Sequence, residues 1–230
     1  MENLWGMAID LDKCTLCGAC VVACQSENNI PIIDEEQSAM GRGIFWMNFL
    51  ADLKEEGGKV DITYYPMPCL HCDKPPCTKV CPVNATMRDS NGIVAQIYFR
   101  CIGCRYCTAG CPYTIKYFNW FKPEWPEELR DQLNPDVTVR DKGVVEKCTF
   151  CSHRLMKARD LAAFEGREVR EGDYVPACME ACPSKAIHFG DLKNEASDVS
   201  VQHRDRRALK LMEELGTEPK CVFLTKGSTK

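Results

Sequence analysis

The sequence contains no uninterrupted apolar run that approaches the length of a membrane span. Its opening residues, Met1–Asp10, are acidic and include neither the basic start nor the apolar stretch of a secretory signal. These two absences predict a protein that is soluble by itself and reaches a membrane only through a partner.

A strong charge of one sign is also absent. Lysine and arginine number 29 against 33 aspartate and glutamate residues, which gives a net charge of −4. No strongly basic field is available to attract nucleic acid, so nucleic acid is not an expected partner. With 230 residues, the chain is long enough for one or two small domains.

Cysteine, in contrast, is abundant, with 17 residues in the chain. The number is odd, and most of these cysteines recur in C-x-x-C spacing rather than being scattered. A disulfide-stabilised secreted domain is typically shorter and does not repeat one ligand spacing. The pattern therefore favours metal ligands over disulfide bonds.

The most informative run is formed by Cys101, Cys104, Cys107 and Cys111, followed by Pro112. This is the complete C-x2-C-x2-C-x3-C-P spacing of bacterial ferredoxins, which bind cubane [4Fe–4S] clusters. The first three thiolates surround one cluster, whereas the fourth serves the other cluster of a two-cluster ferredoxin. One such run therefore implies a second.

Three related groups are present. The first, Cys14, Cys17, Cys20 and Cys24, has the same spacing, but Gln25 stands where proline is expected. A helix that begins near Cys20 would place Cys20 and Cys24 on one face. The missing proline weakens the end of the motif but removes no ligand.

The other two groups deviate in spacing. The second group has two extra residues before its third cysteine and consists of Cys69, Cys72, Cys77 and Cys81. The fourth group is split by a long segment between its second and third cysteines and consists of Cys148, Cys151, Cys178 and Cys182. His71 lies between two of these cysteines and suggests a Cys/His zinc site. Because four thiolates already complete a site, we interpret His71 as a neighbouring or solvent-facing group instead.

Alternating and turn-forming residues predict short strands around these groups. Strands are expected at Gly6–Asp10, Gly43–Leu50, Lys59–Tyr65 and Ala186–Gly190, with hairpin turns at Gly57–Gly58 and Asn91–Gly92. The aromatic stretch Tyr113–Phe121 is compatible both with a strand packed over the clusters and with a docking surface.

Two helices are expected in the second half of the chain. Ser152–Glu165 is a charged segment that ends near Gly166, and Asp205–Leu215 has an amphipathic pattern. Cys221 remains outside the four groups and is expected to be a small residue without metal.

The groups can be paired from their separation in the chain. Only a hairpin separates groups two and three, so they form one unit, and groups one and four form a second unit around it. Sixteen thiolates then make four sites: Cys14, Cys17, Cys20 with Cys182; Cys148, Cys151, Cys178 with Cys24; Cys69, Cys72, Cys77 with Cys111; and Cys101, Cys104, Cys107 with Cys81.

The expected fold class is α+β, with two nested ferredoxin-like modules of the bacterial two-cluster type. Residues 1–36 with 145–200 form one module and residues 67–121 the other. Residues 37–66 and 122–144 are insertions, and residues 201–230 form a C-terminal helix and tail.

Each predicted site is fully ligated by protein, so no open position remains for a substrate. We therefore expect four [4Fe–4S] clusters that transfer electrons, and no catalytic residue in this chain. Charges near the cluster sulfurs tune reduction potentials. The cationic neighbours of the ligands are Lys13, Lys79, Arg105 and Lys147.

The order of the four groups, with the fourth one split, resembles the four-cluster ferredoxin subunit of the complex iron–sulfur molybdoenzyme family, which includes dimethyl sulfoxide, polysulfide and nitrate reductases. The segments Gln25–Pro31 and Pro123–Cys148 are more narrowly similar to the iron–sulfur parts of alternative complex III and of the quinone reductase complex of sulfate-reducing bacteria. Nitrate reductase has tryptophan for one cysteine of the third group, whereas Cys104 is present here.

This resemblance implies an electron-transfer subunit of a membrane quinone reductase. Its partners would be a molybdopterin-type large subunit or a multihaem cytochrome c, and an integral membrane subunit that binds menaquinone. The group-one cluster would lie beside the catalytic subunit and the group-three cluster nearest the membrane. A partner with a twin-arginine signal would place the chain on the periplasmic face, although the sequence also allows the cytoplasmic face.

Two other functions are compatible with the same residues. A soluble polyferredoxin that serves a cytoplasmic dehydrogenase or hydrogenase would use the same clusters. A zinc-binding interaction module would use the same thiolates, although the C-x2-C-x2-C-x3-C-P spacing is specific to clusters.

Overall fold

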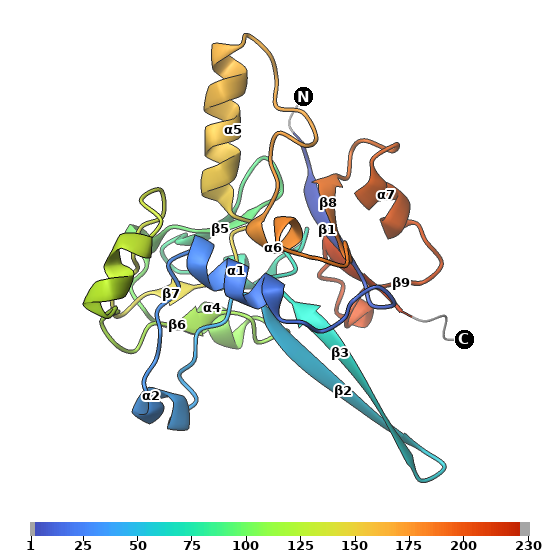
Figure 1. Cartoon of the computed structure of the whole chain (residues 1–230), viewed down its shortest axis with the longest axis horizontal. Coiled ribbons are helices and arrows are strands. Elements are labelled where there is room, and N and C mark those ends of the chain that lie inside the picture. Colours follow the sequence, from blue (N-terminus) through green and yellow to red (C-terminus); the bar gives the residue numbers. More distant parts are fainter. Residues whose placement is uncertain (1–2, 226–230) are drawn as a thin grey trace.

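A four-stranded sheet joins the two ends of the chain in the computed structural model, which describes residues 3–225 (Figure 1). Its central strand β1 (Trp5–Asp10) pairs antiparallel with β8 (Ile187–Asp191) and parallel with β10 (Cys221–Leu224). Strand β9 (Ala208–Leu209) completes the order β8-β1-β10-β9. Every residue of β1 is buried, as expected for a strand inside a sheet that is covered on both faces. The predicted strands at Gly6–Asp10 and Ala186–Gly190 are confirmed.

The amphipathic helix predicted for Asp205–Leu215 is wrong. The helix of this region, α7, is earlier (Asp198–His203), and only a 3-10 turn at Glu213–Leu215 remains inside the predicted range. Ala208 and Leu209 pair instead with Leu224 and Phe223, so strand pairing prevails over the helical spacing of the apolar residues. Strand β10 was not predicted, although a short, fully buried apolar run is typical of a strand.

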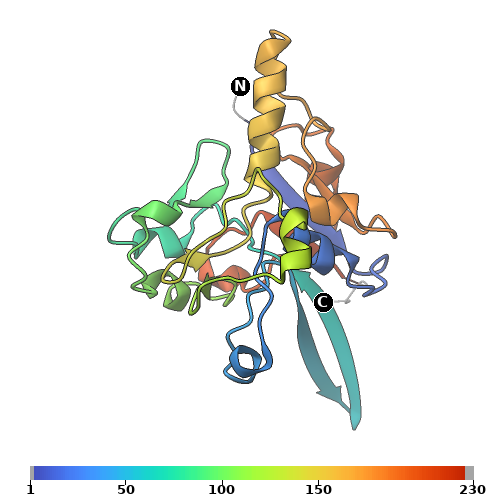
Figure 2. The same cartoon turned by 60° about the vertical axis from the view of Figure 1, so that its left-hand side comes forward.

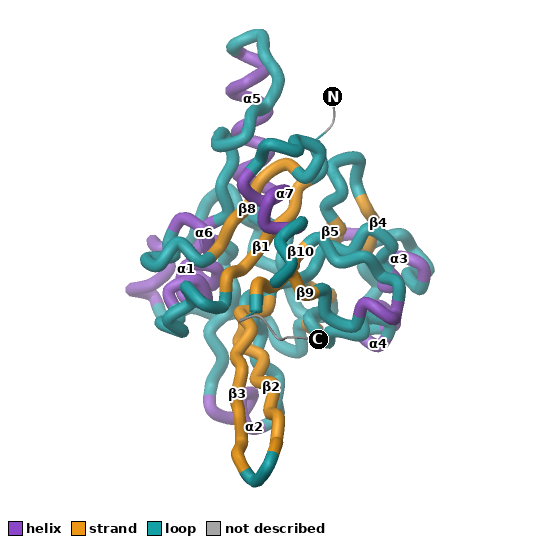
Figure 3. Tube along the Cα trace, turned by 90° about the vertical axis from the view of Figure 1, so that its right-hand side faces the viewer, coloured by secondary structure: helices purple, strands orange, loops and turns teal. Residues whose placement is uncertain are grey.

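A long hairpin projects from the body of the molecule (Figures 1 and 3). It is formed by β2 (Asn48–Glu56) and β3 (Lys59–Met67), joined through Gly57 and Gly58, which both have positive φ. The predicted turn and second strand are confirmed, but the first strand begins at Asn48 rather than at Gly43. The preceding Trp46 is buried in the core instead.

The second predicted hairpin is confirmed as β4 (Thr86–Arg88) and β5 (Val94–Gln96). Gly92 has a φ of 75° in the turn between them, which favours glycine. The aromatic stretch Tyr113–Phe121 forms only a two-residue strand, β6 (Tyr117–Phe118), which pairs with β7 (Val145–Glu146).

Helix α5 (Ser152–Phe164) stands away from the body (Figure 2) and confirms the predicted charged helix. The remaining helices are short. They are α1 (Ala19–Glu27), α2 (Glu35–Ala39), α3 (Pro76–Lys79), α4 (Tyr106–Ala109) and α6 (Ala177–Glu180), with 3-10 turns at Tyr98–Arg100 and Glu127–Gln132. Within residues 3–225, no helix is both long and apolar enough to cross a membrane.

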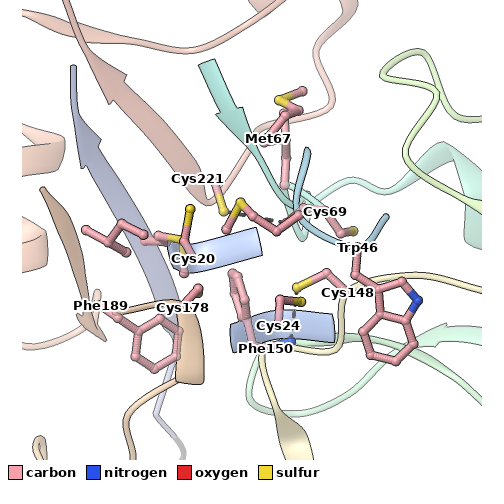
Figure 4. Packing of buried hydrophobic residues seen from close by; sticks show 14 of the residues in the cluster. Cys20, Cys24, Trp46, Met67, Cys69, Cys148, Phe150, Cys178, Phe189 and Cys221 are labelled. Carbon is pink, nitrogen blue, oxygen red and sulfur yellow. Dashed lines mark hydrogen bonds between the residues drawn. The ribbon is translucent and has the colours of Figure 1, made fainter. Parts of the chain in front are cut away.

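The hydrophobic core is built around the cysteines themselves. Figure 4 shows Cys20, Cys24, Cys69 and Cys148 in the same region as the buried ring of Phe150. Trp5, Tyr174 and Phe189 pack with one another beside them, with ring centroids 5.0 to 5.5 Å apart. The fold therefore has mixed helix and strand content with small sheets, as the predicted α+β class requires.

Candidate iron–sulfur sites

The structure brings the predicted sets of four thiols together across motif boundaries. Three sets each surround one cavity: Cys14, Cys17, Cys20 and Cys182; Cys69, Cys72, Cys77 and Cys111; and Cys81, Cys101, Cys104 and Cys107. In the fourth set, Cys24 lies beside Cys148, Cys151 and Cys178, whose negative charges raise its pKa further after the larger effect of burial. We name these the group-one, group-two, group-three and group-four sites after the motif that supplies three of the thiols.

The residues fit the cluster that the spacing predicts. Each of the three cavities is lined by four thiols in addition to apolar groups. Within residues 3–225, no three His, Cys, Asp or Glu side chains converge on a single metal ion. Four thiolates that surround a space, rather than one point, suit a cluster with an iron at each corner.

Each C-x-x-C loop turns in the same way. The residue before its second cysteine has positive φ in all four groups: Leu16, His71, Gly103 and Phe150, with values between 43° and 70°. At Gly103 a side chain would also collide with the Gly143 carbonyl oxygen, so glycine is required there for space as well as for φ. The shared turn directs the first two thiols of each group toward the same site.

Burial dominates the chemistry of the thiols. It raises the pKa of Cys20 and Cys77 to about 11 and the pKa of Cys72 and Cys148 to about 12, with neighbouring cysteines adding to the effect in each case. Since iron binds the thiolate, a cation at these sites is needed to keep the sulfurs deprotonated.

Two cysteines that precede proline have the opposite shift. Burial again disfavours the thiolate of Cys81, but the backbone N–H groups of Thr86, Val83 and Ala85 outweigh it and lower its pKa. Ala85 N–H is 3.2 Å from the Cys81 sulfur, and Ala186 N–H is 3.4 Å from Cys182 in the equivalent turn. The Cys-Pro turn therefore releases backbone donors for the sulfur.

Cys24 has no such turn, because Gln25 allows helix α1 to continue to Glu27 and use its own N–H groups. A side-chain amide takes the place of these backbone N–H donors to the sulfur. Asn28 Nδ2 is 3.7 Å from both the Cys24 and the Cys151 sulfurs and is buried. Arg140 holds this residue in place by donating to the carbonyl oxygens of Asn28 and Asn29 at 2.5 and 3.0 Å. In the sequence, the only signal of this role for Asn28 is its place four residues after Cys24.

One arginine connects α1 and α6, which carry Cys24 and Cys178, with α5, which begins directly after Cys151. Arg154 of α5 donates to Glu27 at the end of α1 at 2.5 and 2.7 Å, and to Glu180 of α6 at 2.6 Å. Hydrogen bonds from Arg154 lower the pKa of Glu27, so its carboxylate stays charged. The pair therefore fixes Cys24 relative to the segments that carry Cys151 and Cys178.

The four sites follow one another in a defined order. Cys20 of the group-one site is close enough to raise the pKa of Cys178 in the group-four site, and Cys69 of the group-two site does the same to Cys148. The group-three site follows on the side of α3 and α4, opposite α1 and α6 (Figure 3). The group-four thiols are all buried, whereas Cys17 and Cys104, in the two terminal sites, are exposed.

Two buried lysines lie between neighbouring sites. Lys147 is fully buried and donates to the carbonyl oxygens of Val94 and Cys148, between the group-four and group-two sites. Lys116 is 6% exposed and lines the group-two cavity. Of the four cations predicted beside the ligands, Lys13, Lys79 and Arg105 are exposed and only Lys147 is buried, while Lys116 was not predicted.

His71 and Cys221 occupy the spaces between sites and do not line the cavities. The His71 ring stacks on Phe150 at 3.7 Å, and its Nδ1 accepts a hydrogen bond from Val94 N–H. Burial, and then the charge of Lys147, lower the pKa of His71 well below its usual value, so it is neutral. Cys221 is fully buried in β10 with its sulfur 3.6 Å from the Cys69 carbonyl oxygen.

The fold and these four thiol sets define a multi-cluster ferredoxin. Three matches to 4Fe-4S dicluster domains cover residues 13–85, 60–126 and 100–187. Together with the sixteen grouped cysteines, they give the chain four [4Fe–4S] clusters as cofactors.

Curated proteins match the chain along most of its length. The iron–sulfur cluster-binding subunit of a menaquinone reductase from Nitratidesulfovibrio vulgaris is 51% identical over 96% of this chain and 89% of its own. A putative iron–sulfur subunit of a dimethyl sulfoxide reductase from Halobacterium salinarum is 38% identical, with 96% and 78% covered. A subunit of the polysulfide reductase of Wolinella succinogenes is 30% identical, with 97% and 95% covered.

The chain thus belongs to the family of iron–sulfur electron-transfer subunits of reductase complexes.

Proposed function

We propose that this chain relays electrons between a catalytic partner subunit and a membrane subunit that reduces menaquinone. The observation that supports the proposal most directly is the order of the four sites, with an exposed thiol at each end and the all-buried group-four site inside. Such an arrangement suits entry of electrons at one end and exit at the other.

The sixteen cysteines are the proposed ligands, with each fourth thiol supplied by the paired motif. When bound, the clusters supply one-electron redox chemistry. The chain itself holds the thiols in position through the C-x-x-C turns, keeps water from the inner sites by burial, and places N–H donors and cations beside the sulfurs. Residues 1–36 with 145–200 and residues 67–121 are the two proposed ferredoxin-like modules.

The partners are proposed from the relatives. The relative with 51% identity is named as a subunit of a menaquinone reductase, and others as subunits of dimethyl sulfoxide and polysulfide reductases. We infer a molybdopterin-type or multihaem partner near the group-one site and an integral membrane partner near the group-three site, on the periplasmic face. These names favour a complex-bound subunit over a soluble polyferredoxin for a cytoplasmic dehydrogenase or hydrogenase.

Purification of the native protein through an affinity tag tests this function. We expect a redox subunit and an integral membrane subunit to co-purify, and we expect the chain to leave the membrane fraction when the gene for the integral subunit is deleted. Recovery of the chain from the soluble fraction of the undeleted strain, bound to a soluble dehydrogenase or hydrogenase and without a membrane subunit, would support the polyferredoxin alternative.

A further inference from the structure

A cluster of buried polar side chains lies between the group-two and group-three sites. It consists of Lys116, Thr86 and Gln96, which are 6%, 1% and 7% exposed. Lys116 lines the group-two cavity, whereas Thr86 and Gln96 line the group-three cavity. The Lys116 ammonium donates to Thr86 Oγ1 and to Gln96 Oε1, both at 3.1 Å, so one set of hydrogen bonds connects the walls of the two sites.

The charge of Lys116 has no protein counterion among residues 3–225, since both of its partners are neutral oxygens. Burial of a cation without a paired anion is strongly unfavourable. A cubane cluster with four thiolate ligands carries net negative charge, and one such site lies on either side of this ammonium group. The two sites therefore supply the counter-charge that the protein does not.

The orientation of the Gln96 amide follows from its partners. Gln96 Oε1 accepts from Lys116 and also from the Thr86 hydroxyl at 2.7 Å. Because an ammonium group can only donate, the amide atom that faces it must be the oxygen. The amide nitrogen then points elsewhere, and within the described part of the chain this buried Nε2 has no hydrogen-bond partner.

An unsatisfied buried donor is unfavourable, so a group without a partner in the protein alone indicates an acceptor that is not protein. Gln96 lines the same cavity as Cys81, Cys101 and Cys107. Cluster and thiolate sulfurs are acceptors, and hydrogen bonds to them tune the reduction potential. The unpartnered amide and the uncompensated ammonium thus both point to the same neighbouring groups.

We propose that Lys116, Thr86 and Gln96 form an electrostatic bridge that raises the reduction potentials of the group-two and group-three clusters together. Lys116 fixes the Gln96 amide so that its Nε2–H donates to a sulfur at the group-three site. Reduction adds one electron and makes or breaks no bond, so the ammonium and the amide stabilise the more negative form. This inference rests on the proposed electron-relay function, because it assigns these residues a role within the relay.

The alternative is that the three side chains only satisfy one another within the fold. A purely structural role predicts lower stability in variants but unchanged potentials at clusters that remain assembled. The potentials of the individual clusters therefore separate the two roles.

The test is redox titration of the anaerobic, cluster-loaded protein, followed by paramagnetic resonance, with the four signals assigned beforehand. For Lys116→Met, we expect the group-two and group-three clusters to become about tenfold harder to reduce, which is about 59 mV for one electron. Lys116→Arg keeps the charge, so the group-two and group-three potentials should stay at their wild-type values. For Gln96→Met, which removes the amide donor, we expect a downward shift at the group-three cluster alone.

Lys59→Met is the matched control, because Lys59 is an exposed lysine at the tip of the β2–β3 hairpin, outside the cluster sites. It should leave all four potentials unchanged, and the group-one and group-four signals should stay constant in every variant. Wild-type potentials in both Lys116→Met and Gln96→Met would overturn the proposal, as would equal shifts at all four clusters. If Lys116→Met fails to assemble, Gln96→Met alone decides, and an unshifted group-three potential overturns the bridge.

The outcome does not depend on which partners the chain has, because the titration uses the chain with its own clusters. Failure of the bridge would leave co-purification with a membrane subunit unaffected, whereas failure of the proposed function would leave the shifted potentials in place.

Discussion

The two proposed modules, called here the first half (groups one and four) and the second half (groups two and three), bring their sets of four thiols together over different distances along the chain. In the half built from groups one and four, Cys182 lies beside Cys14 and Cys20, and strand β1 pairs with the distant β8. In the half built from groups two and three, the equivalent strands β4 and β5 are joined by a tight turn, and Cys111 completes a site only a short segment after Cys77.

The two halves are also held together by different interactions. In the first half, charged groups join distant segments. Glu27 pairs with Arg154, and the fully buried Arg140, which pairs with nearby Glu146, donates to the carbonyl oxygens of Asn28 and Asn29. The second half relies on proline-rigidified loops, a turn and the neutral acceptors of Lys116. Directional charged hydrogen bonds specify which distant segments meet, whereas neighbouring segments are already positioned by short connections. Charged hydrogen bonds are therefore found where the segments that must meet are far apart in the chain.

The largest effect is expected from removal of a thiol that crosses between paired motifs. Cys182→Ser should disturb the group-one cluster, and Cys111→Ser should disturb the group-two cluster, since serine oxygen is a harder and weaker cluster ligand than thiolate. We expect loss of about one iron, or a shifted signal, at that one site in each variant. Iron analysis and assigned paramagnetic resonance spectra measure this.

Cys24→Ser is the companion variant within the first half, and it should alter the group-four signal while the group-one signal is retained. If Cys24→Ser altered the group-one signal instead, each motif would close its own cluster. The crossed arrangement would then hold at most for groups two and three.

Much of this comparison could be predicted from sequence, because cysteine spacing reflects ligand geometry directly. The four groups, strand β1, the Asn91–Gly92 hairpin and helix α5 all follow from local patterns. Residues that act between distant segments could not be predicted. Asn28 and Lys116 are ordinary polar residues in the sequence, and only the fold places them beside sulfurs or between cavities.

The C-terminal strand shows the same limit. Cys221–Leu224 is only a short apolar run, and its partner β1 is at the other end of the chain. The amphipathic pattern of Asp205–Leu215 favours a helix, because such a pattern is visible locally whereas the pairing of Ala208 and Leu209 with β10 is not.

The next largest effect is expected at the buried charged pair of the first half. Arg140→Leu leaves Glu146 without its cation, although Asn119 and Trp46 still donate to it at 2.8 and 3.1 Å. Breaking a buried pair on one side costs about 3–5 kcal/mol, and the loss of the Arg140 contacts to Asn28 should also shift the group-four signal. Guanidinium unfolding of the anaerobic, cluster-loaded protein measures the stability.

The matched control is Lys157→Met, which removes the exposed pair between Lys157 and Asp136. Exposed pairs contribute about 0–1 kcal/mol, so this variant should unfold near the wild-type midpoint. The double variant Arg140→Leu with Glu146→Leu should recover part of the loss, because no uncompensated charge is buried. If Arg140→Leu and Lys157→Met had equal unfolding midpoints, the buried charged pair would not be what stabilises the first half.

The smallest effect is expected at Glu27, which joins α1 to α5 through Arg154 and His153. Glu27→Gln should lower stability by about 1.5–3 kcal/mol at neutral pH, the usual range for hydrogen bonds to a charged group. Hydrogen bonds from Arg154 lower the pKa of Glu27 below 4.5, so the carboxylate stabilises the fold above that pH. As the pH falls through the lowered pKa, Glu27 is protonated and the difference between wild type and Glu27→Gln should shrink.

Glu180 accepts from the same guanidinium but is 65% exposed, so Glu180→Gln should change the midpoint little at any pH. A wild-type advantage over Glu27→Gln that grew on acidification would show that this pair does not link the helices of the group-four site.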